Sequence, residues 1–302
     1  MRAATEQTYQ ERILRVLVHV QEHLDESLPL ETLARVACFS PYHFHHVFGA
    51  MVGESVKEHI RRLRLERAAY RLQFGNQPVT GIGLDAGYKT HESFTRAFRA
   101  MFGTSPSRFR KLQRRRVSAA APSGVHYLPE GRLADFDPVQ RGGPPMDVRI
   151  TILSPLKVAF LRHVGPYEGE GLGRTWDRLL FWAGQRGLLG LRTKLLGIDH
   201  DNPHVTPPDK LRYDACVATD RPVEPEGDVG TQEIPGGEYA VVTHRGPYET
   251  LPETYARLYG DWLPQSGREP AEAPGFQHYR TTPRETASPD LVTDIYVPLR
   301  PR

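Results

Sequence analysis

Apolar residues recur at helical spacing over the first third of the chain. Between residues 8 and 24 they form one stripe, which predicts a helix that packs against its neighbours. The stripe consists of Ile13, Val16, Leu17, Val20 and Leu24. A shorter apolar stretch at 30–37 predicts a second helix, and Ser40-Pro41 after it supplies an N-cap residue followed by a first-turn proline. A short helix, a tight turn and a capped helix are typical of a helix-turn-helix unit.

The helix that begins after Ser40 has an apolar face and a polar face. Its apolar positions follow the i, i+3, i+4, i+7 spacing and are Phe44, Val47, Phe48 and Met51. A recognition helix brings its N-terminal residues to base edges in the major groove. We therefore predict that the polar side chains of this helix contact bases. They are Tyr42, His45 and His46, with His43 at the edge of the face.

The same unit occurs a second time, 50 residues later. Among the residues that recur at this spacing are Phe44/Phe94, Phe48/Phe98, Met51/Met101 and Gly53/Gly103. In the second copy Thr90 is the predicted N-cap, and the residues predicted to contact bases are His91, Glu92, Thr95 and Arg96. Arg96 is the best single candidate for a bidentate contact to guanine.

A longer stretch joins the two copies. Ser55 caps a segment that runs to Phe74, in which arginines are interleaved with apolar residues, and this pattern predicts a rigid connecting helix. Its arginines, and the basic residues of the second copy, are candidates for phosphate contacts. An arginine run is equally typical of a solvated helix face. The predicted contacts to the DNA backbone are Arg61, Arg62, Arg99, Arg110 and Lys111.

The helical pattern covers residues 8–112 and then stops. Residues 113–146 combine the basic run Arg114–Arg116 with alanine, glycine and proline, which predicts a linker. In 147–302, short β-type runs alternate with two helical stretches, at 175–185 and 251–263. The expected strands are 148–153, 158–163, 213–219, 239–244 and 293–299. The chain is thus expected to fold as an all-α domain followed by an α+β domain.

The second domain also repeats internally. The segment His163–Glu168 recurs as His244–Glu249, 81 residues later, and both copies contain Gly-Pro-Tyr-Glu. Asp214 and Asp294, each before an apolar run, recur at a spacing of 80. These repeats imply a duplicated domain with pseudo-twofold symmetry, and a groove along its axis is a natural place for a ligand.

Charge and composition separate the two halves further. Up to Arg116 there are 19 Lys and Arg against 11 Asp and Glu, whereas the remainder has 20 against 25. The basic half suits a polyanion. No apolar run is long enough to span a bilayer and no apolar signal core begins the chain, so we expect a cytoplasmic protein. The two cysteines lie far apart and the three clustered histidines lack zinc-site spacing, so we expect neither a disulfide nor a metal, and no cofactor.

The second helix-turn-helix copy carries the residues of a known family. They are Gly87-Tyr88, Ser93-Phe94, Arg96, Phe98, Gly103, Ser105-Pro106 and Phe109-Arg110, preceded by the Leu30–Phe48 unit. On these motifs residues 8–112 resemble the double helix-turn-helix DNA-binding domain of the AraC/XylS family of transcription regulators. The resemblance implies two units that enter successive major grooves of double-stranded DNA. It also assigns base reading to the two polar sets named above.

Residues 147–302 resemble the GyrI-like effector-binding domain. The resemblance rests on the two Gly-Pro-Tyr-Glu elements, the Arg212–Val217 segment and the terminal Asp294–Leu299. It implies a duplicated βαββ unit with a central cleft for bulky, often aromatic or cationic compounds. Flat side chains suit such a ligand, although many of them are equally expected in an ordinary core. The predicted ligand-binding residues are Tyr167, Trp176, Tyr213, Tyr248, Phe276, Gln277, Tyr279 and Tyr296. Four acids, Glu168, Glu249, Asp214 and Asp294, are further candidates.

One position departs from the GyrI-like pattern. Members commonly carry a glutamate shortly before the tyrosine in the segment equivalent to Phe276–Tyr279, where this chain has Gln277. An amide attracts a cation much less than a buried carboxylate does, so a preference for cations does not carry over with the resemblance.

Together these features predict a one-component transcription regulator. A small-molecule effector would change how the DNA-binding half engages its promoter or RNA polymerase. Two alternatives stay open for the second half: a hydrolase of reactive small molecules, and a module that sequesters a ligand or binds a partner. The sequence contains no nucleophile elbow and no metal-ligand cluster, which favours a protein that is not an enzyme and has no catalytic residues.

Overall fold

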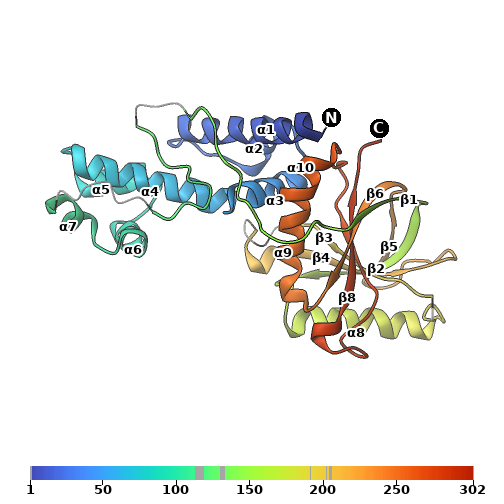
Figure 1. Ribbon diagram of the computed structural model, residues 1–302. Helices are drawn as coiled ribbons and strands as arrows, with labels where there is room; N and C mark the ends of the chain where they lie inside the picture. The colour runs from blue at the N-terminus through green and yellow to red at the C-terminus, as the bar shows by residue number, and fades with distance from the viewer. Residues whose placement is uncertain are drawn as a thin grey trace. The chain divides into compact units, whose positions relative to one another are not determined.

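A computed structural model describes residues 2–112, 119–129, 133–190, 192–201, 203 and 206–301 of the chain, with side chains from residue 8 onward. The chain divides into two compact units, one formed by Gln7–Val139 and the other chiefly by Gln140–Arg302. Figure 1 shows the first as helical and the second as a sheet with helices packed on it. The prediction of an all-α domain followed by an α+β domain is confirmed.

The first unit contains seven helices in its described part. They are α1 (Arg2–Glu22), α2 (Leu30–Val36), α3 (Pro41–Val52), α4 (Val56–Phe74), α5 (Val79–Asp85), α6 (His91–Phe102) and α7 (Pro106–Lys111). Helices α2–α3 and α5–α6 are the two helix-turn-helix units, and α4 connects them (Figure 1). A capping box at Ser55 starts α4, in which the Ser55 and Glu58 side chains bond each other's backbone N–H groups.

The 50-residue duplication repeats the ends of the recognition helices. Ser40 and Thr90 cap the N-termini of α3 and α6 by accepting a hydrogen bond from the backbone N–H three residues on. Gly53 and Gly103 end the same helices in the left-handed conformation, with φ of 80° and 71°. A left-handed residue at a helix end favours glycine because a Cβ would be strained there. The sequence repeat therefore fixes helix length and position as well as the apolar face.

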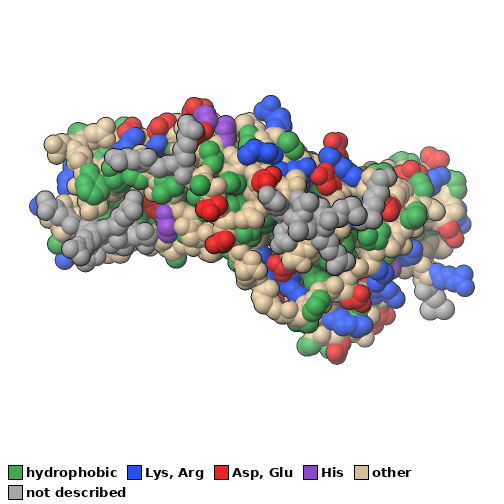
Figure 2. All heavy atoms as spheres, turned by 45° about the horizontal axis from the view of Figure 1, so that its top comes forward, with side chains coloured by type: hydrophobic (Ala, Val, Ile, Leu, Met, Phe, Trp, Pro, Cys, Tyr) green, Lys and Arg blue, Asp and Glu red, His purple; other side chains and the backbone are tan. Residues whose placement is uncertain are grey.

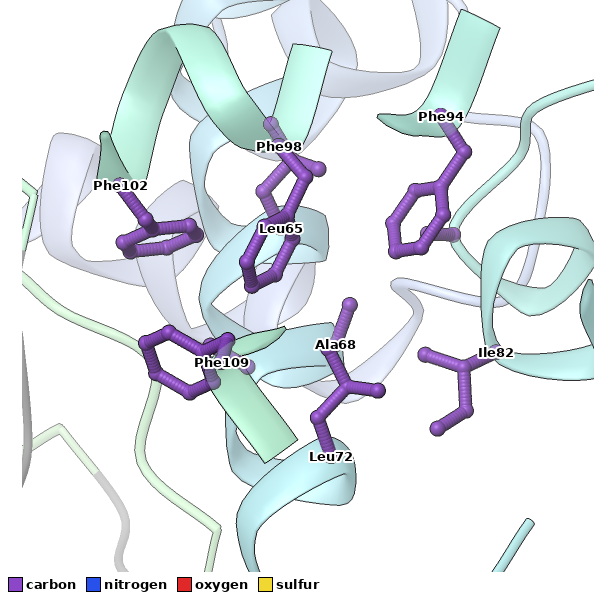
Figure 3. Packing of buried hydrophobic residues seen from close by; sticks show 10 residues of the cluster. Leu65, Ala68, Leu72, Ile82, Phe94, Phe98, Phe102 and Phe109 are labelled. Carbon is purple, nitrogen blue, oxygen red and sulfur yellow. The ribbon is translucent and has the colours of Figure 1, made fainter. Parts of the chain in front are cut away.

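A cluster of aromatic residues holds α6 in place. Figure 3 shows Phe94, Phe98 and Phe102 of α6 pointing toward α4 and α5, with Phe109 of α7 beside them. The rings of Phe98 and Phe109 meet edge to face, with centroids 5.3 Å apart. Because the apolar side of α6 is fully buried here, its opposite side is turned to solvent.

The segment after α7 also belongs to the helical unit. Val125 and Phe136 are buried, and the backbone N–H of Val139 donates to the carbonyl of Met51 at 2.8 Å. The Gln10 amide donates to the carbonyl of Phe136 at 2.7 Å. The compact unit thus extends to Val139, past the predicted domain limit at 112 and into the predicted linker 113–146. Two isolated apolar residues among proline and glycine show no period, so the sequence pattern did not reveal this packing.

The second unit is built on one antiparallel sheet of eight strands. They are β1 (Val148–Leu153), β2 (Leu156–Val164), β3 (Leu195–Asp199), β4 (Arg212–Ala218), β5 (Val229–Ile234), β6 (Gly237–Arg245), β7 (Phe276–Tyr279) and β8 (Val292–Pro298). Their order across the sheet is β1-β6-β8-β7-β3-β4-β2-β5. Helix α8 (Glu170–Gln185) follows β2, and α9 (Leu251–Arg257), a π-helical turn (Leu258–Trp262) and α10 (Leu263–Ser266) follow β6 (Figure 1).

The duplication predicted from the 80-residue and 81-residue repeats is visible in this order. Strands β2, β3 and β4 with α8 correspond to β6, β7 and β8 with α9, and the two βαββ halves meet where β3 pairs with β7. Gly197 and Gln277 face each other at this junction. In addition, each half begins with a strand that pairs with the other half, since β1 joins β6 and β5 joins β2. We call this arrangement the strand exchange.

Apolar residues pack on both faces of the sheet. One face packs under α8 through Leu179, Ala183, Ala215 and Val217, and residues at alternate positions form a separate core on the other face. The five predicted strands are all present, but β3, β5 and β7 were not predicted. They are four to six residues long. A short run of this kind carries too few positions to show a period.

Candidate DNA-binding surface and ligand site

Helix α6 presents the polar face that its sequence predicts. His91, Glu92, Arg96 and Arg99 are exposed, and Thr95 is half-buried. The Thr95 hydroxyl lies 3.4 Å from the His91 Nε2 atom one turn earlier. Charged and hydrogen-bonding groups therefore line the N-terminal half of a helix whose other side is fixed in the core. This is the geometry that a major-groove reader requires.

Helix α3 differs from α6 in its burial. Tyr42 and His46 are half-buried, but His43 and His45 are 1% and 7% exposed. The prediction that His45 points outward is wrong in this structure, and His43, expected at the edge of the polar face, is buried as well. Eight of the twelve residues of α3 are buried, against three in α6, because apolar residues occupy more of its circumference. The His45 Nδ1 atom lies 3.2 Å from the carbonyl oxygen of Pro41, in its own helix.

Among the predicted backbone contacts, the arginines of α4 divide into two kinds. Arg61 is exposed, as predicted. Arg62 is 4% exposed, and its guanidinium donates to Glu54 and to Glu66, at 3.1 Å from Glu54 Oε2 and 3.0 Å from Glu66 Oε1. A phosphate contact by Arg62 is therefore a wrong prediction, because two carboxylates draw its side chain inward. Burial alone raises the pKa of Glu54, but hydrogen bonds from His59 and Arg62 outweigh it and lower that pKa to about 2.

Basic residues continue from α6 into α7. Arg96, Arg99, Arg108 and Lys111 are exposed. Arg110 is half-buried, and its guanidinium donates to the carbonyl of Gln77 at 2.5 Å. The four exposed cations lie within sixteen residues, with Glu92 as the one acidic residue of the two helices. They can neutralise phosphates on either side of a groove.

In the second unit, aromatic rings from both halves gather at the junction of β3 and β7. We call Tyr167, Trp176, Tyr213, Tyr248 and Tyr279 the aromatic cluster. The centroid of Trp176 lies 5.7 Å from that of Tyr279 and 6.4 Å from that of Tyr213. Tyr167 lies 6.0 Å from Tyr213, and Tyr248 lies 5.4 Å from Tyr279. All but Tyr213 are partly exposed, so the cluster is open to solvent. The sequence predicted all five as ligand-binding residues.

The two Gly-Pro-Tyr-Glu elements deliver Tyr167 and Tyr248 to this place. His163 and His244, at the ends of β2 and β6, lie 3.1 and 3.2 Å from the carbonyls of Pro166 and Pro247 and bond the turns that carry the tyrosines. The Tyr167 hydroxyl lies within 2.9 Å of the carbonyls of Asp201 and Arg212, which holds its ring in place. Each element is therefore a turn that positions one aromatic ring.

A chain of hydrogen bonds runs under the rings. The Tyr279 hydroxyl donates its single proton to Gln277 Oε1 at 2.8 Å. In the hydrogen bond between the two tyrosine hydroxyls, also 2.8 Å long, Tyr213 is therefore the donor and Tyr279 the acceptor. The Gln277 amide donates to Asp199 Oδ2 at 2.6 Å and to the Tyr255 hydroxyl at 3.0 Å. A Cβ on Gly197 would come within 2.2 and 2.6 Å of the Tyr213 and Tyr279 hydroxyl oxygens. Only glycine leaves room for this pair of tyrosines.

Asp199 was not predicted as a site residue. It ends β3, is partly buried, and forms no ion pair with a Lys, Arg or His of the residues that the structure describes. Burial is the main influence on this carboxyl group and raises its pKa to about 6, against the hydrogen bond from Gln277. A sequence gives no sign of which acid lacks a cationic partner, because partners come from distant strands.

Two of the other four candidate acids, Asp214 and Asp294, are paired with basic side chains. Asp214 accepts from Arg162 at 2.7 Å and from His200, and Asp294 accepts from Arg149 and Arg280, each at 3.1 Å. Both carboxylates are therefore compensated inside the sheet. Glu168 and Glu249 are exposed.

Two of the predicted ligand residues lie elsewhere. Phe276 is buried and stacks on Tyr296, with ring centroids 4.5 Å apart, in the core on the opposite face of the sheet. Successive residues of a strand point to opposite faces, so Phe276 cannot share a face with its neighbour Gln277. The prediction that Phe276 and Tyr296 join the ligand site is wrong for this reason.

Charge on the visible surface of the second unit is mixed. On the face drawn in Figure 2, basic and acidic side chains of the described residues are interspersed over this unit. On this face, charges of the two signs alternate and neither gathers into a patch. No three His, Cys, Asp or Glu side chains in the described part of the chain are grouped so as to hold a metal. No described helix is long and apolar enough to cross a membrane.

Comparison with known proteins agrees with this division. Residues 33–112 match the model of a helix-turn-helix domain, and residues 146–300 match that of the GyrI-like small molecule binding domain. The probable transcriptional regulator YgiV of Escherichia coli (strain K12) is 31% identical over 157 residues, which are 51% of this chain and 96% of YgiV. The right origin-binding protein of Escherichia coli (strain K12) is 23% identical over 298 residues, 94% of this chain and 96% of that protein.

One solved structure extends the comparison of the second half. The crystal structure of the EcmrR C-terminal domain covers 52% of this chain and 99% of its own, with a TM-score of 0.43 and 19% identity. The family models and the curated relatives agree on the kind of protein. The chain belongs to the GyrI-like family and is an AraC-type DNA-binding transcription regulator with a GyrI-like effector-binding domain in its C-terminal half.

Proposed function

We propose that this regulator reads two successive major grooves, with α6 as the principal reading helix and α3 as the second. The exposed polar face of α6 carries the proposal, because Arg96 and His91 project from a helix that the aromatic core immobilises. Exposed Arg99, Arg108 and Lys111 supply contacts to the flanking phosphates. Tyr42 and His46 are the residues of α3 that stay accessible for the second groove.

Selection of bound fragments from a random DNA library, followed by footprinting, tests this proposal. The expected footprint has two protected major grooves, about 10 base pairs apart, on one face of the duplex. Affinity should fall steeply as salt rises, because phosphate contacts release counterions. Equal affinity for selected and random DNA would contradict it.

We further propose that the aromatic cluster is the effector site. Rings from both halves converge there, most of them partly exposed, beside a carboxylate. This arrangement suits a flat aromatic compound, which can stack on or between the rings. A ligand at the junction of β3 and β7 contacts both halves of the duplicated domain, so it can change their packing.

Binding of aromatic compounds to the full chain can be followed by equilibrium dialysis. The Trp176→Ala variant should bind more weakly, whereas Trp182→Ala should not, because Trp182 lies outside the cluster and bonds Glu226. Equal loss in both variants would contradict this placement. Effector occupancy should also change the affinity for the selected DNA fragment.

The site is proposed to bind its ligand without chemical change. The Tyr213 and Tyr279 hydroxyl groups bond each other and Gln277, and desolvation raises the pKa of both, so neither is poised to act as a base. Recovery of an unaltered ligand after prolonged incubation is expected. Steady formation of a product, abolished in the Asp199→Asn variant, would favour the hydrolase alternative.

A further inference from the structure

Asp199 differs from the two buried aspartates of the second unit in having no ion pair with a basic side chain of the described residues. Asp214 and Asp294 each accept from at least one arginine. Asp199 accepts one hydrogen bond, from the neutral Gln277 amide, among the residues that the structure describes. Its second oxygen, Oδ1, has no such partner there and is not sealed from solvent. A partly buried carboxylate in this situation is unfavourable until a positive charge approaches it.

The surroundings of Asp199 favour an organic cation over a metal ion or a hydrated one. The nearby groups are the aromatic cluster and the Tyr255 hydroxyl, and the described residues form no metal-binding group. Aromatic faces attract a delocalised or alkylated cation through their quadrupoles and replace little of its weak hydration shell. A small hydrated ion would lose much more hydration free energy at the same place.

The hydrogen-bond chain supports an ionised Asp199. A carboxylate only accepts, so it fixes the Gln277 amide with Nε2 toward Asp199 and Oε1 toward Tyr279. The protons of Tyr213, Tyr279 and Gln277 then all point toward the carboxylate. Such a chain polarises each member in one direction and stabilises the negative charge at its end.

We propose that Asp199 is the counter-charge that makes the aromatic cluster select organic monocations, in place of a carboxylate at position 277. The two positions lie on adjacent strands, because Gly197 pairs with Gln277 and Asp199 follows two residues later on the same face. The proposed counter-charge therefore lies on β3, beside β7, at the junction of the two halves. This inference rests on the proposed function of the cluster as the effector site.

A matched pair of ligands tests the charge separately from the site. N-methylquinolinium and 1-methylnaphthalene have the same shape, and only the first is charged. In equilibrium dialysis with the full chain at pH 7.5, the cation should bind at least tenfold more tightly than the neutral compound. Asp199→Asn should remove this preference and leave the neutral compound unaffected.

A relocation variant makes the test specific to the charge. Adding Gln277→Glu to Asp199→Asn restores a carboxylate on the neighbouring strand, and the preference for the cation should return. Asp228→Asn, which removes an exposed aspartate paired with Arg178, is the matched control and should change nothing. If wild type binds both compounds equally, or Asp199→Asn keeps the preference, the charge proposal fails while the site stands. If neither compound binds, the site proposal fails as well.

The proton on Asp199 gives an independent readout. Burial raises the pKa of this carboxyl group to about 6, so protonation on going from pH 7.5 to pH 5 should weaken cation binding about tenfold. The other titratable or charged groups around the site include His200, Asp201, Arg212, Cys216 and the hydroxyls of Tyr255 and of the tyrosines in the aromatic cluster. The pH effect should vanish in Asp199→Asn, and its persistence in that variant would show that Asp199 is not its source.

Weaker cation binding in Asp199→Asn should not come from a less stable fold, because this substitution should make the fold more stable at pH 7.5. A carboxyl group whose pKa is raised in the folded state stabilises the fold at low pH, and this contribution is lost as the pH rises from about 4 to 6. At pH 7.5 without ligand, Asp199→Asn should therefore raise the melting temperature while it weakens cation binding. A lower melting temperature would mean that Asp199 serves the fold and would overturn the proposal.

Discussion

At the residue scale, Arg96 of α6 is the exposed side chain that we propose contacts a base. Its position on α6, one turn after the helix N-terminus, was predicted from the 50-residue repeat, and the structure leaves its guanidinium exposed. Replacement by alanine should weaken binding to the selected DNA by about 1–3 kcal/mol and relax one base position. Repeating the selection with the variant measures both effects.

The control for Arg96 is Arg174→Ala, which removes an exposed arginine from α8 in the other unit. It should leave the selected sequence unchanged. An Arg96 variant that selects the same bases as wild type would exclude this residue from base reading.

Gly197 matters because it has no side chain, which leaves room for the Tyr213 and Tyr279 hydroxyls in the aromatic cluster. Alanine at this position would place Cβ against both hydroxyls of the Tyr213–Tyr279 pair. We expect Gly197→Ala to lower the melting temperature and to weaken binding of both test ligands, charged and neutral, because the rings must move. Gly190→Ala meets nothing within 4 Å and is the control. Unchanged ligand binding in Gly197→Ala would show that the tyrosine pair does not shape the site.

At the scale of elements, strongly periodic segments were predictable and short or irregular ones were not. The recognition helices and strands β1, β2, β4, β6 and β8 follow from apolar spacing. Strands β3 and β7, which carry Asp199 and Gln277, contain five and four residues. The centre of the proposed ligand site thus lies in the elements with the weakest apolar pattern. The sequence predicted all five rings of the aromatic cluster, two of them from the paired Gly-Pro-Tyr-Glu motifs, but not the carboxylate.

The same limit applies to the burial of α3. Amphipathic spacing separates an inner face from an outer one, but it does not show how far burial extends around a helix. His43 and His45 lie beside the apolar stripe, and the structure buries both. Arg62 is a parallel case, since its two acidic partners are residues 54 and 66 of the connecting region. Tertiary partners therefore decide which polar residues of a helix remain available.

The segment after α7 should contribute to the stability of the helical unit. Phe136 is 5% exposed although it lies outside any helix or strand. Phe136→Ala should lower the free energy of unfolding of this unit by about 3–5 kcal/mol, because it removes a buried ring. Urea unfolding followed by helical circular dichroism measures the change. Phe74→Ala, at a residue that is 65% exposed, should have little effect. Equal effects of the two substitutions would contradict a packing role for the segment.

At the scale of the whole molecule, two duplications serve two kinds of recognition. The first repeats a reading helix after 50 residues, which suits a polymer with a repeating groove. The second repeats a βαββ half after about 80 residues and places the copies side by side in one sheet, which suits one compact ligand.

The strand exchange in the second unit leads to a prediction about its integrity. The segment 219–228, between β4 and β5, is largely exposed, and a protease site inserted there would divide the two halves. After cleavage the pieces should stay together, because β1 still pairs with β6 and β5 with β2. Size-exclusion chromatography under native conditions should give the mass of the intact chain. Separation of the pieces without denaturant would contradict this expectation.

The exchange also limits how an effector can enter. The β3–β7 junction is short, with three residue pairs. The two halves are also held together by the β1–β6 and β2–β5 ladders, which have six residue pairs each. Parting them like a hinge would break all three ladders at once. An effector should therefore reach the cluster from its solvent-open side, and any rearrangement that it causes should involve α8, α9 and the two tyrosine-bearing turns while the sheet stays whole. An effector would then act by moving the helices and turns relative to the sheet, and it would not separate the two halves of the domain.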